Sequence, residues 1–252
     1  MRQTPFAFLS LAALVVAATP RAQWKTPWSY EGAEGPEHWA QLDPAYAACA
    51  GREQSPIDIR GAERANLPPL RFEYQSGPLK YLINNGKTVR VNYHGADNQN
   101  FLVVGDQRYQ LTQFHFHRPS EELVNGKPYD MVAHFMHQTS DGQVAGVAVL
   151  LQAGGANSLV QQLWDHMPLT EGPEHEIPGV QINPAALLPK NLSYYRYRGS
   201  LTAPPCTEGV TWFVLKTPVS VSAAQINAFA ALYPHDVRPP QPLNGRVIQE
   251  NQ

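Results

Sequence analysis

Residues 113–120 read QFHFHRPS and place two histidines between two phenylalanines. Side chains alternate across a β-strand, so His115 and His117 share one face while Phe114 and Phe116 share the other. Imidazoles about 7 Å apart on one strand face fit two interpretations, a polar core and two corners of a metal site. The surrounding sequence has to distinguish between them.

A second histidine-containing stretch follows at residues 131–137, which read MVAHFMH. His134 and His137 are three positions apart, so they point to opposite faces of a strand. If this strand pairs antiparallel beside the first, only one of them can face His115 and His117, and the other is expected to hydrogen-bond inside the structure. Three neutral imidazoles with a fourth position open to water are typical of a catalytic zinc site. A set of hydrogen-bonded core histidines is the alternative.

The length allows one large domain or two small ones, and an undivided chain favours one domain over residues 23–252. Hydrophobic residues make up 43% of the 252-residue chain and charged residues 16%, so a sizeable core can be buried. A formal net charge of -2 gives no basis for a nucleic-acid partner. The 23 prolines and 18 glycines are spread along the chain as turn residues, and no repeat or low-complexity linker divides it.

Short runs that alternate in polarity or are rich in β-branched residues predict a mainly antiparallel sheet. Helical patterns are few and cover residues 158–166 and 222–232, the second with Ser220 or Ser222 as its N-cap and Pro234 beyond its end. The expected fold is therefore mainly β, with a few short peripheral helices. The predicted strands cover residues 79–83, 88–93, 100–104, 109–117, 131–138, 144–152 and 210–216, with turn signals at Asn85-Gly86, Asn125-Gly126 and Asp141-Gly142.

The first 22 residues are typical of a secretory signal peptide. Arg2 precedes an apolar run over residues 6–18 that is short for a membrane span and is followed by small residues. Cleavage is expected after Ala18 or after Ala22, and a retained membrane anchor is the alternative. The mature protein is then exported, periplasmic or secreted, and without membrane association.

Export bears on the state of the two cysteines of the chain, Cys49 and Cys206. In an oxidising compartment we expect them to form one long-range disulfide, two free thiols being the alternative. Closing a loop of that length contributes roughly 4–5 kcal/mol in the chain-entropy description.

Nearly the whole mature chain, from residue 28 to residue 248, resembles the α-class carbonic anhydrases, most closely the exported bacterial ones. The resemblance implies a single domain built on a twisted, mostly antiparallel sheet of about ten strands, with one zinc ion per chain at the bottom of a cone. It also implies a disulfide between Cys49 and Cys206. The motifs that carry it are WSY (28–30), GPEHW (35–39), QSPID (54–58), NNG (84–86), QFHFH (113–117), SE (120–121), HFMH (134–137), GSLTAPPC (199–206) and QPLNGR (241–246).

The resemblance also assigns roles to single residues. His115, His117 and His134 correspond to the zinc ligands, and zinc lowers the pKa of its bound water to about 7, which gives a hydroxide that attacks carbon dioxide. Thr202 corresponds to the residue that accepts a hydrogen bond from this hydroxide, and Glu121 to the carboxylate that takes the Thr202 proton.

Two further groups follow from the same resemblance. Gln113 corresponds to the hydrogen-bond partner that orients His115. A small apolar substrate needs an apolar wall, which would consist of Met136, Gly146, Leu201, Val210 and Trp212.

The implied activity is the reversible hydration of carbon dioxide to bicarbonate and a proton by a monomer or homodimer, with weak esterase side activity. A non-catalytic binding protein on the same scaffold is the alternative function.

The chain departs from the family pattern at the positions that carry protons and hold the third ligand. Lys87 stands where active members often have a proton-shuttling histidine, and a lysine is already protonated at neutral pH. We therefore expect slow proton export that imidazole buffers partly rescue. Val132 stands where many members have a glutamate that holds the third ligand, so His134 is expected to lack a charged partner.

The wall of the pocket departs from the pattern as well. Met136 and Gly146 occupy positions where valines are commoner, so one position gains volume and the other loses it. Ala203 replaces a frequent second threonine beside Thr202. Altered inhibitor or substrate fit is the expected consequence.

Overall fold

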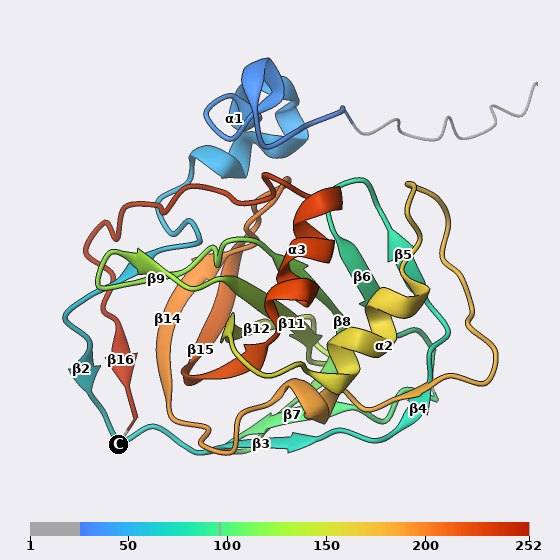
Figure 1. The fold of residues 1–252 in the computed structure, drawn as a ribbon. Coiled ribbons are helices and arrows are strands. Elements are labelled where there is room, and N and C mark those ends of the chain that lie inside the picture. The colour runs from blue at the N-terminus through green and yellow to red at the C-terminus, as the bar shows by residue number, and fades with distance from the viewer. Residues whose placement is uncertain (1–25, 96, 252) are drawn as a thin grey trace, which may run out of the picture.

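A computed structural model describes residues 26–95 and 97–251, and a large twisted β-sheet runs through the middle of the molecule (Figure 1). The predicted signal peptide, with both of its candidate cleavage sites, lies outside these residues. The sheet has 11 strands, in agreement with the predicted mainly β domain. Its order is β2 (Glu63–Arg64), β16 (Gln249–Glu250), β14 (Tyr194–Ser200), β15 (Glu208–Val221), β12 (Val144–Ala153), β11 (Met131–Gln138), β8 (Gln107–His117), β6 (Val89–Asn92) and β5 (Leu82–Asn84), while β7 (Phe101–Val104) pairs with β8 and β3 (Leu70–Glu73) with β7.

Smaller elements surround this sheet. A short sheet combines β1 (Asp58–Ile59), β9 (Leu123–Val124) and β10 (Lys127–Pro128), and β4 (Gly77–Pro78) pairs with β13 (Gln181–Ile182). The α-helices are α1 (Trp39–Leu42), α2 (Ser158–His166) and α3 (Ala223–Leu232), and the 3-10 helices are η1 (Gly32–Glu34), η2 (Pro44–Ala50) and η3 (Pro184–Leu187).

All seven predicted strands overlap strands of the structure, and most of the pairings are antiparallel as expected. Three pairings are parallel, β12 with β15, β16 with β2 and, in the short sheet, β1 with β9. The pattern missed β14, which reads YYRYRGS, because its arginines interrupt the apolar alternation that marks a strand. Arg196 and Arg198 nevertheless belong to a strand that pairs with β15 along its length.

The two strands that carry the histidines are neighbours. β8 and β11 pair antiparallel, with His134 directly opposite His115, and the register shifts between Met136 and His137. His137 is three positions from His134 and so points to the opposite face of β11, where its Nε2 is 2.6 Å from the hydroxyl of Tyr74. Both expectations about this strand are confirmed, since it lies beside the first one and its second histidine is hydrogen-bonded inside the structure.

The opposite face of β8 packs under the helices. Phe114 and Phe116 belong to the largest apolar cluster and are 0% and 1% exposed. α2 and α3 lie over this face (Figure 1), where the Trp164 ring is 4.9 Å from that of Phe116. Both predicted helices are present, and a capping box at Ser222 begins α3. The phenylalanines are therefore buried in the core, which leaves the histidine face for the site.

The predicted disulfide between Cys49 and Cys206 is present and links positions 157 residues apart. It ties the η2 segment to the loop that follows Thr202. Arg238 supports this junction because its Nη2 donates to the carbonyl oxygen of Cys49 at 3.0 Å. Residues 26–95 and 97–251 form no helix with the length and apolar character needed to cross a membrane.

Candidate metal centre and active-site pocket

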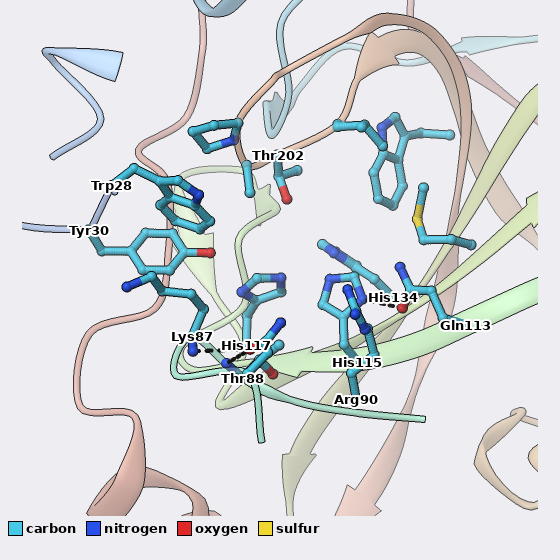
Figure 2. Close-up of a pocket in the computed structure, with 16 residues that line it drawn as sticks. Trp28, Tyr30, Lys87, Thr88, Arg90, Gln113, His115, His117, His134 and Thr202 are labelled. Atoms are coloured by element: carbon cyan, nitrogen blue, oxygen red, sulfur yellow. Dashed lines mark hydrogen bonds between the residues drawn. The ribbon is translucent and has the colours of Figure 1, made fainter. Parts of the chain in front are cut away.

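The structure brings His115, His117 and His134 together at the base of a pocket (Figure 2). One ring nitrogen from each lies within 4.8 Å of those of the other two. The ring centroids are 4.9 to 5.4 Å apart, so the three imidazoles form one compact group. Strand alternation places the first two on one face of β8, and the antiparallel register with β11 adds the third.

The first two imidazoles are each held through their Nδ1 atom. His115 donates from Nδ1 to Oε1 of Gln113 at 2.7 Å, which is the partner that the sequence analysis expected. His117 donates from Nδ1 to the backbone carbonyl oxygen of Asp236 at 2.6 Å. Since an imidazole that donates from Nδ1 keeps the lone pair on Nε2, both rings present Nε2 to the group.

The third imidazole is held by a carboxylate, contrary to the expectation drawn from Val132. The Nε2 atom of His134 lies 2.9 Å from Oε1 of Glu122, and both side chains are 0% exposed. Val132 itself is completely buried in an apolar cluster. The carboxylate that holds His134 comes from the segment after β8. Two consecutive glutamates stand there, at 121 and 122, and only the first was assigned a role from the sequence.

Two buried nitrogens in this group have no hydrogen-bond partner, Nε2 of His117 and Nδ1 of His134. A buried polar atom without a partner carries a desolvation penalty, which a metal ion would remove. Burial first, and then the neighbouring imidazoles, hold the pKa values of His115 and His117 well below the usual histidine range. Both rings are therefore neutral, which is the form that binds zinc, so the residues fit a zinc ion.

Glu121 lies against the same nitrogens. Its Oε2 is 3.5 Å from Nε2 of His117 and 3.8 Å from Nδ1 of His134, while its Oε1 accepts a hydrogen bond from the backbone N–H of Arg238 at 2.8 Å. Burial raises the pKa of Glu121 to about 7, although His134, the Arg238 N–H and the Thr202 hydroxyl act in the opposite direction. The structure thus brings Glu121 into the group.

Carboxylates on both sides determine the protonation of His134. Burial alone would lower its pKa, but the charge and the hydrogen bond of Glu122, together with the charge of Glu121, raise it above the ordinary histidine value. The pKa of His134 is thus raised, whereas the pKa values of His115 and His117 are lowered.

The pocket above the histidines has a volume of about 210 Å³. Its wall is apolar on one side and carries Thr202 over the histidines (Figure 2). The lining residues are Trp28, Tyr30, Asn85, Lys87, Thr88, Arg90, Gln113, His115, His117, His134, Met136, Leu201, Thr202, Ala203, Pro204 and Trp212.

A sequence profile of the eukaryotic-type carbonic anhydrases matches residues 34–252. The chain belongs to the α-carbonic anhydrase family. It is 42% identical over 229 residues to a carbonic anhydrase of Nostoc sp., a match that covers 88% of this chain and 85% of that protein. Carbonic anhydrases are lyases, and the chain is an enzyme of this class.

Solved structures give the same result. An α-carbonic anhydrase from Thermovibrio ammonificans, in complex with the inhibitor sulfanilamide, has a TM-score of 0.84 and 41% identity, covering 89% of this chain and 99% of that one. The α-carbonic anhydrase of Photobacterium profundum has a TM-score of 0.82 and 42% identity, with coverages of 89% and 100%.

In this carbonic anhydrase the apolar wall is arranged differently from the sequence expectation. Of the five residues expected there, Met136, Leu201 and Trp212 line the pocket, whereas Gly146 and Val210 do not. Gly146 lies between Met136 and Trp212 in the strand register, and a Cβ atom on it would be 2.7 Å from the Trp212 ring. The indole therefore occupies the space above the glycine. Val210 is 2% exposed and lies in the apolar cluster behind the indole.

Two cationic side chains line the pocket. The ammonium of Lys87 is 5.3 Å from the centroid of the Trp28 ring, beside Tyr30 (Figure 2). Asn85 fixes the turn below it by accepting hydrogen bonds from the backbone N–H groups of Lys87 and Thr88 at 3.0 and 2.9 Å. Arg90 also lines the pocket and was not expected from the sequence, although its alternation on β6 places it opposite His115.

Proposed function

We propose that this chain hydrates carbon dioxide reversibly to bicarbonate and a proton, with one zinc ion held by His115, His117 and His134. The observation that carries the proposal is the set of buried imidazole nitrogens without partners at the base of a partly apolar pocket. Zinc bound there would lower the pKa of a water molecule to about 7 and so supply hydroxide at neutral pH. The family and its named relatives support the same reaction.

The residues of the chain orient the reactants. Thr202, which is 6% exposed, lies over the histidines and interacts with Glu121. When its hydroxyl donates to that carboxylate, its lone pairs remain free to accept a hydrogen bond from the attacking oxygen, which fixes the direction of attack. The apolar surfaces of Met136, Leu201 and Trp212 provide a place for carbon dioxide, which has no charge to pair.

The proton must then leave through the rim. Lys87 stands at the rim, and among the described residues no imidazole besides the three at the base lines the pocket to accept the proton. We expect the proton to pass mainly to buffer that diffuses into the pocket. The same nucleophile would also attack activated esters weakly, as a side activity.

The first experiment is stopped-flow carbon dioxide hydration with the purified protein, with the zinc content measured on the same sample. The expected result is about one zinc per chain and turnover that a sulfonamide abolishes. Zinc binding without hydration would overturn the proposed reaction and favour a binding protein on the same scaffold.

We also propose that the protein is exported. The long-range Cys49–Cys206 disulfide supports an oxidising compartment, and the apolar N-terminal stretch supports a signal peptide. N-terminal sequencing of the mature protein from a bacterial periplasm tests this. A first residue at position 19 or 23 is expected, and an intact Met1 would contradict it.

A further inference from the structure

Glu122 makes a contact that the catalytic proposal does not use. Its carboxylate is completely buried, and Oε1 and Oε2 lie 2.9 and 3.2 Å from the Nε2 atom of His134. Because a carboxylate accepts, this nitrogen must carry the hydrogen of the imidazole. In the neutral ring, Nδ1 of His134, which is buried and without a partner, then keeps its lone pair toward the other two histidines.

The backbone that carries Glu122 is fixed independently of β11. The Ser120 hydroxyl donates to the carbonyl oxygen of Glu122 at 2.7 Å and accepts from the N–H of Tyr129 at 2.9 Å. The next residue, Leu123, donates its N–H to the carbonyl oxygen of Ile57 at 3.2 Å. The backbone on both sides of the Glu122 side chain is therefore held by segments other than β11.

The strand that carries His134 supplies no such partner. Val132 lies two positions earlier on the same face, where it is 0% exposed among apolar residues that include Ile57 and Leu150. The sequence resemblance places a glutamate at this position in many relatives, and here it is replaced by an aliphatic side chain. β11 thus offers the ring no carboxylate at this position, while one reaches it from the segment after β8.

We propose that Glu122 is the positioning residue of the third metal ligand, and that it substitutes for the missing carboxylate of β11. It acts through His134, whose tautomer and ring orientation it sets. The inference rests on the zinc site proposed above. Partners of this kind affect metal affinity or activity about 10–100-fold when they are removed.

Zinc affinity is the measurement that tests this role. The parent, Glu122→Gln and Glu122→Ala are stripped of zinc, and the dissociation constant is determined by competition with a chelator. We expect about tenfold weaker binding for Glu122→Gln, which keeps the shape but not the charge, and up to about 100-fold for Glu122→Ala. Glu176→Gln, which removes an exposed carboxylate, should bind zinc like the parent.

Folded variants that bind zinc within about threefold of the parent would overturn the positioning role. A parent that takes up no zinc would instead overturn the proposed function, so the two failures are distinguishable. The Gln variant is isosteric and keeps the test valid if Glu122→Ala does not fold.

Two further readouts separate positioning from a merely structural contact. Imidazole nitrogen NMR of the zinc-free parent should show His134 with its proton on Nε2, and Glu122→Ala should show a mixture of tautomers; an unchanged tautomer would count against the role.

Exchanging the two side chains, Glu122→Val with Val132→Glu, should restore much of the zinc affinity that Glu122→Val alone loses. An exchange variant that folds but regains no affinity would contradict the substitution of one carboxylate for the other.

Discussion

The base and the rim of the pocket are built in different ways. At the base, each of the three imidazoles is held by a separate partner, a side-chain amide, a backbone carbonyl and a carboxylate. At the rim, the ammonium of Lys87 has a ring contact with Trp28 at 5.3 Å and no acidic partner among the ion pairs of the described residues. The geometry of the histidines is thus set by several elements at once, whereas the proposed role of the rim in proton export rests on one position, Lys87. Changes at the base should affect metal binding and reaction, and changes at the rim should affect only the rate.

The largest effect is expected at the base, from His117→Ala. With one of three ligands gone, zinc should be lost at the dilution of an assay, and carbon dioxide hydration should fall by at least about 10³-fold, which corresponds to several kcal/mol of metal-derived stabilisation. Zinc analysis and stopped-flow assays check this. His235→Ala, at a side chain that is 69% exposed, is the control and should keep both. Full activity of His117→Ala would refute the proposed ligand set.

Thr202→Ala comes next, because it removes orientation but leaves the metal in place. We expect kcat/KM for hydration to fall by about 10²-fold, as for the loss of one preorganised hydrogen bond in an active site. Zinc content should remain that of the parent. Thr202→Ser keeps the hydroxyl and should retain most of the activity. Equal loss in both variants would mean that the methyl group, and not the hydroxyl, is what the site uses.

An intermediate effect is expected at the wall, from Gly146→Val. Since even a Cβ atom would lie 2.7 Å from the Trp212 ring, the indole must move, and overpacking of this kind costs about 1–3 kcal/mol. Urea unfolding of the zinc-loaded protein measures this loss. Adding Met136→Val should recover part of it, because Met136 is the cross-strand neighbour of Gly146. A Gly146→Val protein as stable as the parent would show that the wall is not tightly packed.

The smallest effect is expected at the rim, from Lys87→His. A histidine can accept and release protons near neutral pH, so turnover in weak, imidazole-free buffer should rise by roughly tenfold. Zinc affinity should not change. The parent should gain more from added imidazole than the variant does. A parent with high turnover that is indifferent to buffer would show that Lys87 does not limit proton export.

The sequence predicted those parts of the molecule that depend on local alternation. His115 and His117 share a face because they are two residues apart, and α3 begins where the serine cap is found. The parallel pairing of β12 with β15 was not predictable from local patterns, because 54 residues lie between the end of β12 at Ala153 and the start of β15 at Glu208.

The partner of His134 was missed for a similar reason. The search for a carboxylate followed β11 back to Val132, but the carboxylate that reaches the ring comes from Glu122, on a different segment. The place of Gly146 was missed because the indole that covers it belongs to β15. In both cases the deciding neighbour lies on another element.

The parallel seam between β12 and β15 has a consequence for the order in which the molecule assembles. The three histidines lie on β8 and β11, which pair antiparallel and are close in the chain, whereas Thr202 and Trp212 come only after β12 and its long crossover. Contacts between distant segments form late because their loop-closure entropy is greater. The three histidines therefore belong to neighbouring strands that can pair early, whereas Thr202, Trp212 and the Asp236 carbonyl that orients His117 come from later segments, so the site is complete only when distant parts of the chain have come together.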